Sequence, residues 1–100
     1  MDKNEIVAWL DAKLVENIIV LDFINKSSEF DYMIVGHVSN VRLLEAVANY
    51  LIDDLDNCRI EGKADSGWIL IDSGNIIIHL FLENIRYQYG LEKLWQEYVI

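Results

Sequence analysis

The stretch Trp68–Leu82, which reads WILIDSGNIIIHLFL, has the pattern of a β-hairpin and largely decides the fold. It contains two runs rich in β-branched and aliphatic residues, Trp68–Asp72 and Asn75–Leu82. Between them, the sequence Asp72-Ser73-Gly74-Asn75 supplies residues that favour tight turns. We therefore predict two antiparallel strands joined by a short loop.

The position of the loop fixes which side chains share a face of the hairpin. A loop made of Ser73 and Gly74 pairs Trp68 with His79 across the two strands. Because side chains alternate between the two faces of a strand, this register places only apolar residues on one face. We expect that face to lie in the core; its members are Ile69, Ile71, Ile76, Ile78, Leu80 and Leu82.

The opposite face of the hairpin mixes large apolar groups with an acid, an amide and a histidine. Its members are Trp68, Leu70, Asp72, Asn75, Ile77, His79 and Phe81. Aromatic anchors beside a few polar groups are typical of protein–protein hot spots. The alternative is a second core face under a helix. That alternative is favoured for Ile77 and Phe81, whereas both interpretations stand for Trp68 and Asp72.

Outside the hairpin, the spacing of apolar residues predicts helices and further strands, with no proline in the chain. A first helix over Lys3–Asn17 starts at an Asp2 N-cap, and its apolar stripe extends to Leu14. The other expected elements are a strand buried on both faces at Ile18–Phe23, a strand at Tyr32–Val38, a helix from a cap at Ser39 or Asn40 to about Asp53, a short edge strand at Cys58–Glu61, a loop at Gly62–Gly67 and a helix at Asn84–Tyr98 broken near Gly90.

This order of elements predicts an α/β fold: a single domain over residues 1–100, with a mixed five-stranded sheet flanked by helices. The last helical segment is rich in aromatic residues. We expect Leu91 and Leu94 to pack on the sheet, with the acids Glu92 and Glu97 exposed. For the aromatic side chains Tyr87, Tyr89 and Trp95, both packing and partner contact remain open.

The composition limits the classes of partner. The chain has 17 acidic and 8 basic residues, and its formal net charge is −9. Nucleic-acid affinity comes mostly from Lys and Arg, so we expect little direct nucleic-acid binding and a basic protein partner instead. No apolar run reaches the ~18 residues that span a bilayer, and Cys58 is the single cysteine. We expect a cytoplasmic protein that does not bind membranes.

No group of residues supports catalysis or a cofactor. His37 and His79 lack the spacing of a ligand pair, and a histidine in an apolar strand is more often structural. Asp54-Leu55-Asp56 has two-metal spacing but follows a helix instead of a strand, which favours a solvated helix end. Cys58 has no candidate base and is expected to be a buried thiol. We predict that the protein is not an enzyme and holds no metal or cofactor.

Four segments, in this order along the chain, carry a resemblance to a known family: Glu61-Gly62, Trp68-Ile69-Leu70-Ile71-Asp72-x-Gly74, Ile78-His79-Leu80-Phe81 and Arg86-x-x-Tyr89-x-Leu91-Glu92-x-Leu94-Trp95. They resemble the ribosomal silencing factor family, also called the Iojap-related family, and the resemblance covers nearly the whole chain. Two positions depart from the family pattern. Gly74-Asn75 stands where Gly-Asp is usual, and Gly36–Asn40 stands where the family has a Gly-Thr-Ser-like loop.

The resemblance implies a nucleotidyltransferase-like fold without the catalytic carboxylates. It also implies a translation repressor that binds the large ribosomal subunit at its fourteenth protein, blocks joining with the small subunit and aids late large-subunit assembly. By the family pattern, Trp68 is the anchor, Asp72 the partner of a Lys or Arg, and Leu70 an apolar contact. Further candidates, which alternatively hold the hairpin to the last helix, are His79, Arg86 and Tyr89.

Two other functions remain as alternatives. A small nucleotidyltransferase-like enzyme needs carboxylates on adjacent strands, and only Asp22 and Asp72 are expected to be strand carboxylates. A homodimeric adaptor would use the exposed apolar groups of the hairpin as a self-interface. A homodimer of the free protein and a ribosome binder could use the same surface in turn.

Overall fold

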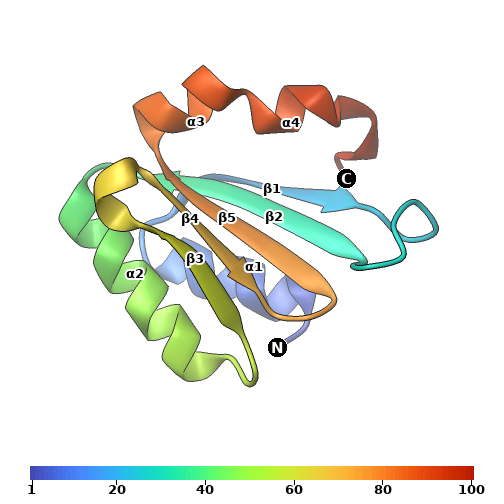
Figure 1. The fold of residues 1–100 in the computed structure, drawn as a ribbon, viewed down its shortest axis with the longest axis horizontal. Helices are drawn as coiled ribbons and strands as arrows, with labels where there is room; N and C mark the ends of the chain where they lie inside the picture. The colour runs from blue at the N-terminus through green and yellow to red at the C-terminus, as the bar shows by residue number, and fades with distance from the viewer.

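The computed structural model describes residues 1–100 and contains one mixed five-stranded sheet in the order β1-β2-β5-β4-β3. Figure 1 shows α1 and α2 on one side of the sheet and α3 and α4 on the other. The α/β fold with a five-stranded sheet flanked by helices is thus confirmed. The elements are α1 (Lys3–Ala12), β1 (Glu16–Asp22), β2 (Tyr32–Val38), α2 (Val41–Asp54), β3 (Arg59–Lys63), β4 (Trp68–Asp72), β5 (Ile76–Leu82), α3 (Glu83–Tyr89), α4 (Leu91–Leu94) and 3₁₀ turns at Ala64–Ser66 and Gln96–Tyr98.

The centre of the sheet is a parallel pair, β2 and β5, which runs in register from Tyr32 opposite Ile76 to Val38 opposite Leu82. The other three pairs, β1 with β2, β4 with β5 and β3 with β4, are antiparallel. The expected β2 bounds are confirmed to the residue. The edge strand β3 extends two residues beyond the expected Glu61, so the predicted loop at Gly62–Gly67 starts later and contains a 3₁₀ turn.

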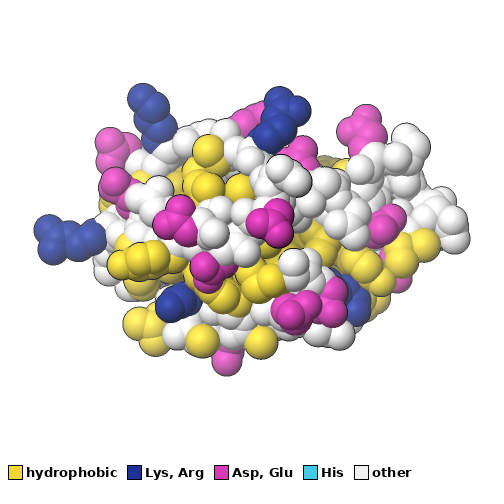
Figure 2. All heavy atoms as spheres, turned by 90° about the horizontal axis from the view of Figure 1, so that it is seen from below, with side chains coloured by type: hydrophobic (Ala, Val, Ile, Leu, Met, Phe, Trp, Pro, Cys, Tyr) yellow, Lys and Arg dark blue, Asp and Glu magenta, His cyan; other side chains and the backbone are white.

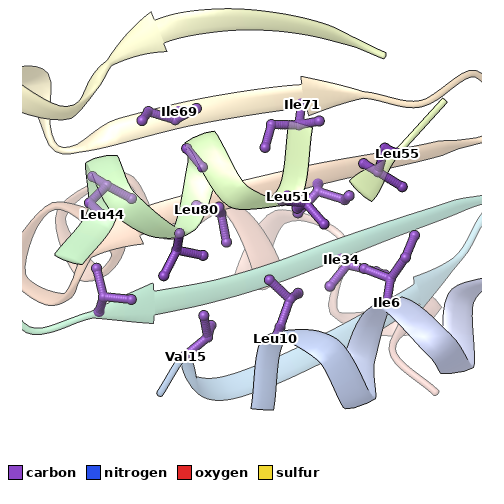
Figure 3. Packing of buried hydrophobic residues seen from close by; sticks show 14 of the residues in the cluster. Ile6, Leu10, Val15, Ile34, Leu44, Leu51, Leu55, Ile69, Ile71 and Leu80 are labelled. Atoms are coloured by element: carbon purple, nitrogen blue, oxygen red, sulfur yellow. The ribbon is translucent and has the colours of Figure 1, made fainter. Parts of the chain in front are cut away.

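The larger of two hydrophobic clusters fills the space between the sheet and the helices α1 and α2 (Figure 3). In Figure 3, Ile6 and Leu10 of α1 and Leu44 and Leu51 of α2 point toward the strands. The predicted apolar face of the hairpin belongs to this cluster: five of its members are buried, and Leu82 is half-buried against them. The hydrophobic effect of burying that face is the main stabilising force on this side.

The second cluster lies on the other face of the sheet, beneath the C-terminal helices. Its buried members are Leu21, Phe23, Met33, Val35 and Phe81. Trp95 and Tyr98 pack edge-on against the Phe23 ring, at centroid distances of 5.6 and 4.9 Å. The hairpin residue Phe81 is therefore core, as favoured, and the segment after Gly90 is tied to the sheet by aromatic contacts.

Helix α2 follows the predicted pattern. The Asn40 side chain caps it by accepting a hydrogen bond from the Leu43 N–H at 2.8 Å. The stripe residues that face the sheet are buried, and Val41 packs at their margin; the buried ones are Leu44, Val47, Ala48 and Leu51.

The prediction for the first helix was wrong at its C-terminal end. Helix α1 ends at Ala12, not Asn17, and Leu14 has a φ of +70° and is 70% exposed. Val15 is buried instead, and its N–H donates to the Leu10 carbonyl at 3.1 Å. The chain leaves the helix there because β1 has to begin at Glu16 to pair with β2.

Strand β1 is an edge strand, so the expectation of burial on both faces was only partly right. Ile18 and Val20 contact the larger cluster and Ile19 the second, but all three are half-buried, and only Leu21 is fully buried. The outer edge is partly covered by the C-terminal residues. The Ile100 N–H donates to the Val20 carbonyl at 2.9 Å, and Val99 bridges to Leu21.

The hairpin forms, but its register differs from the prediction by two residues. The observed pairs are Asp72 with Ile77, Leu70 with His79 and Trp68 with Phe81, which centres the loop on Gly74 and Asn75. A shift of two residues keeps every side chain on its predicted face. The loop moves because the Asp72 carboxylate accepts from the Gly74 N–H at 2.9 Å and the Ser73 N–H donates to the Ile76 carbonyl. Gly74, with a φ of +93°, takes the first central position, where a type II′ turn favours glycine.

The C-terminal helical segment breaks at Gly90, as predicted, where φ is +59°. Two expectations beyond the break were wrong: Leu94 is 71% exposed, and the carboxylate of Glu92 is turned inward. Helix α4 has only four residues, and its orientation is set by an ion pair between Glu92 and the buried Arg86. Glu97 is exposed, as expected.

Cys58 is half-buried and not fully buried as expected, because it lies at the entry to the edge strand. Its Sγ contacts the Ile52 carbonyl at 3.8 Å. No helix in the structure combines the length and the apolar character that crossing a bilayer requires.

Candidate protein-binding site on the hairpin

The C-terminal helices leave part of their sheet face uncovered along β4. Trp68, Leu70 and Asp72 alternate onto this face, and each is half-buried. Tyr89, at the end of α3, borders them, and its side chain is 59% exposed. We call these four residues the hairpin patch. The patch contains four of the six residues that the resemblance to the family suggested as partner contacts.

The Trp68 indole is held in one orientation by three neighbours. Its Nε1–H donates to Nδ1 of His79 at 3.0 Å. Phe81 stacks on the ring with centroids 5.1 Å apart and an angle of 22°, and the Tyr89 ring lies 4.7 Å away. A large aromatic side chain that is already ordered loses little conformational entropy on binding, which is the property of an interface anchor.

His79 is the fifth candidate, and it lies beneath the patch with 5% of its surface exposed. The indole nitrogen can only donate, so His79 accepts at Nδ1 and carries its proton at Nε2. Burial lowers the pKa of His79 from 6.5 to about 4, so the ring stays neutral at pH 7. Its position allows it to orient Trp68 without touching a partner itself.

The two carboxylate oxygens of Asp72 have different surroundings, one in the turn and one facing solvent. Oδ1 accepts the hydrogen bond from the Gly74 N–H, and the side chain makes no ion pair within 4 Å. Arg59 of β3 is its cross-strand neighbour. One carboxylate oxygen thus stabilises the loop, and the other is left for a cation from outside.

A hollow of about 270 Å³ opens beside the indole. Trp68, Leu70 and Tyr89 supply its apolar wall. Glu61, Gly62 and Ser66, which the sequence reasoning did not select as site residues, complete the lining. The Glu61-Gly62 pair was part of the family motif, but β3 was expected to end at Glu61, so nothing indicated that the pair faces Trp68.

Arg86, the sixth candidate, lies apart from the patch and is 1% exposed. Its Nε donates to the Glu92 carboxylate at 2.9 Å, and Nη1 lies 2.9 Å from Nδ1 of His37 and 3.4 Å from the Glu16 carbonyl. These contacts join α3 and α4 to β1 and β2. They are the contacts of a residue that holds the last helix on the sheet, which was the alternative role considered for Arg86.

His37 is buried next to Arg86, which agrees with a structural role. Its Nε2 lies 3.4 Å from the Glu83 carboxylate and 4.0 Å from that of Glu16. Since Nδ1 faces the Arg86 guanidinium, which can only donate, the ring accepts there and its Nε2–H points toward the acids.

The carboxylates do not assemble a metal site. Asp22 and Asp72 stand on β1 and β4, which are separated by both β2 and β5, so they cannot share an ion. Asp22 instead accepts from the Ile24 N–H, and Asp54 accepts from the Trp9 indole at 2.7 Å. No three His, Cys, Asp or Glu side chains come together as ligands.

The surface charge is spread and acidic. Figure 2 shows the side of the molecule opposite α3 and α4, where acidic side chains are scattered among hydrophobic ones and the few basic ones lie mainly near the margin. The net charge of the whole chain is −9, which opposes the close approach of phosphate groups.

Comparisons with known proteins agree with the resemblance. The model of the family described as "Ribosomal silencing factor during starvation" matches residues 2–99. The ribosomal silencing factor of Bacillus subtilis is 32% identical over 93 residues, covering 88% of this chain and 79% of that protein. A mouse protein named "Mitochondrial assembly of ribosomal large subunit protein 1" is 32% identical over 102 residues, covering 94% of this chain and 45% of its own. A crystal structure of a Chromobacterium violaceum protein superimposes with a TM-score of 0.80 at 30% identity, covering 96% of this chain and 88% of that one.

Proposed function

Because this chain belongs to the ribosomal silencing factor family, we propose that it represses translation by binding the large ribosomal subunit and keeping the small subunit from joining. The proposed contact surface is the hairpin patch, and the proposed partner on the subunit is its fourteenth protein. A related role in large-subunit assembly is suggested by the name of the mouse relative.

The observation that carries the proposal is the ordered, half-exposed Trp68 on an otherwise acidic molecule. Its hydrogen bond to His79 and its stack on Phe81 hold the indole ready for contact. Leu70 and Asp72 lie on the same strand face and offer an apolar contact and a negative charge. Ribosomal proteins are generally basic, so the charges are complementary.

The proposed mechanism is steric and involves no bond making. A body measuring 36 × 30 × 22 Å, seated on the joining face of the large subunit, occupies the space that the small subunit needs. No side chain has to act as an acid, base or nucleophile for that effect. The separation of Asp22 from Asp72 by two strands further disfavours nucleotidyl transfer, which requires both carboxylates on the same metal ions.

The test is co-sedimentation of the purified protein with isolated large and small subunits, followed by addition of the missing subunit. We expect binding to large subunits only, and fewer joined ribosomes as the protein concentration rises. If the protein binds neither subunit, or binds without reducing joining, the proposal fails. A nucleotide-plus-magnesium thermal shift would then test the enzyme alternative.

The Trp68→Ala variant tests the contact surface. We expect at least a ~30-fold loss of large-subunit binding, because a central aromatic hot spot is worth 2 kcal/mol or more. Trp9→Ala is the matched control: Trp9 is also half-buried but sits on α1, across the sheet, and should change binding less than about twofold. Far-UV circular dichroism establishes that both variants fold. Equal binding by the two folded variants would remove Trp68 from the site.

A further inference from the structure

The hollow beside Trp68 combines an aromatic wall with a free negative charge. Trp68 and Tyr89 line one part, and the exposed Glu61 stands at the rim. Unlike Asp72, whose Oδ1 is engaged by the turn, the Glu61 side chain makes no hydrogen bond and no ion pair within 4 Å. The hollow therefore presents both features that attract an organic cation.

We propose that this hollow receives one arginine side chain of the partner, with its guanidinium against the Trp68 and Tyr89 rings and paired with Glu61. The inference rests on the proposed function for the identity of the partner, a basic protein of the large subunit. It assigns to Glu61 the charge-pairing role that the family pattern suggested for Asp72.

Arginine fits the site better than lysine. The guanidinium is flat and weakly hydrated, so it can lie against an aromatic ring while its N–H groups bind a carboxylate at two points. An ammonium group carries the same charge but is strongly hydrated and cannot form the two parallel hydrogen bonds. Trp68, Leu70 and Tyr89 make one side of the hollow aromatic and aliphatic, which favours the cation with the lower desolvation cost.

Two features of the structure keep this hollow open, the glycine at position 62 and the fixed orientation of the Trp68 indole. Gly62 lines it with a φ of +89°, and a Cβ there would lie 2.5 Å from the Trp68 carbonyl oxygen. A larger residue would push β3 away from β4 and separate Glu61 from Trp68. On the other side, the hydrogen bond to His79 and the stack on Phe81 keep the indole from rotating into the hollow.

The first arm of the test uses large subunits and a matched pair of charge variants. Glu61→Gln removes the rim charge, and Glu29→Gln removes a charge that is also exposed, from the loop between β1 and β2. Both variants have the same net charge. We expect Glu61→Gln to weaken large-subunit binding by about tenfold or more and Glu29→Gln by less than twofold. If the wild type binds and the two variants weaken equally, the cation pocket is wrong although the proposed function stands.

The second arm needs no ribosome. The Trp68 indole N–H resonance of the isotope-labelled protein is followed while N-acetyl-arginine amide, its lysine counterpart or its uncharged citrulline counterpart is added. We expect the arginine probe to shift the resonance at lower concentration than the lysine probe, the citrulline probe to leave it unchanged, and Glu61→Gln to abolish the difference.

The two arms separate the two proposals. A Glu61-dependent arginine response from a protein that binds no large subunits keeps the pocket and overturns the proposed function. Equal responses to arginine and lysine overturn the choice of arginine, and equal responses to arginine and citrulline overturn the charge pairing.

Discussion

His79 is a buried titratable residue that also orients Trp68 in the hairpin patch. The pKa of His79 is about 4 in the folded protein and 6.5 in the unfolded chain. Between these pH values, His79 therefore binds fewer protons in the folded state than in the unfolded state. The contribution of neutral His79 to the free energy of unfolding is therefore complete above pH 6.5 and is lost as the pH falls toward 4, by up to about 3 kcal/mol.

The His79→Gln variant isolates this contribution, because glutamine offers an acceptor for the Trp68 N–H but does not titrate in this range. Urea unfolding of both proteins from pH 8 to pH 4 gives the difference between their free energies of unfolding. We expect a constant difference above pH 7 and a decline in the advantage of the wild type below 6.5. Parallel curves down to pH 4 would show that burial does not hold His79 neutral.

For single residues, the sequence predicted correctly those features that depend only on the alternation of side chains along a strand. It grouped Trp68, Leu70 and Asp72 on one face, and that grouping survived the two-residue error in register because the side-chain period is two. The contact between Trp68 and His79 was predicted as a direct cross-strand pair, whereas the two residues lie on a diagonal. The burial of Arg86 could not be predicted, since a charged residue is exposed unless tertiary partners neutralise it, and its partners come from three other elements.

Helices α3 and α4 depend on one buried ion pair and a set of aromatic contacts. Arg86→Leu leaves the inward-facing Glu92 without its cation and His37 without its donor. Breaking a buried pair by removing one partner costs about 3–5 kcal/mol. Hydrogen exchange should accelerate over residues 83–98 far more than over α2, which contacts neither residue. Exchange that rises equally in both segments would contradict this local role.

A double variant separates the missing pair from the lost side chain. Arg86→Leu combined with Glu92→Leu removes both charges, and replacing a buried ion pair by apolar groups is often close to neutral. We expect the double variant to recover part of the stability lost by Arg86→Leu, as measured by urea unfolding. A double variant less stable than the single one would mean that Glu92 is stabilised by contacts other than Arg86.

Among the elements, those with a local signal were predicted closely. Helix α2 has its Asn40 cap and a continuous stripe, and the break after α3 has Gly90. The end of α1 lacks such a signal, because Leu14 continues the stripe at helical spacing. What ends the helix is the pairing of β1 with β2, a contact between distant segments that periodicity does not report. The inward orientation of Glu92 comes from its ion pair with Arg86, whose own burial depends on contacts with β1 and β2.

The molecule as a whole should unfold as one unit. The two hydrophobic clusters lie on opposite faces of the same strands. Disruption of the sheet would therefore expose both clusters at once. We expect far-UV circular dichroism and tryptophan fluorescence, to which Trp95 on the C-terminal segment contributes, to report the same urea midpoint. In Arg86→Leu, the fluorescence change should come first. Two separate midpoints in the wild type would indicate that the C-terminal helices detach on their own.

The parallel pairing of β2 with β5 places the middle of the sheet between segments that are far apart in the chain. Within the sheet, strand β5 pairs with both β2 and β4, so it is the strand that links the β1-β2 pair to the β4-β3 pair, which carries Trp68. A copy whose synthesis stops before residue 76 therefore lacks the strand between these two pairs, together with His79 and Phe81, which orient the Trp68 indole. The hairpin patch therefore cannot form until β5 has been synthesised.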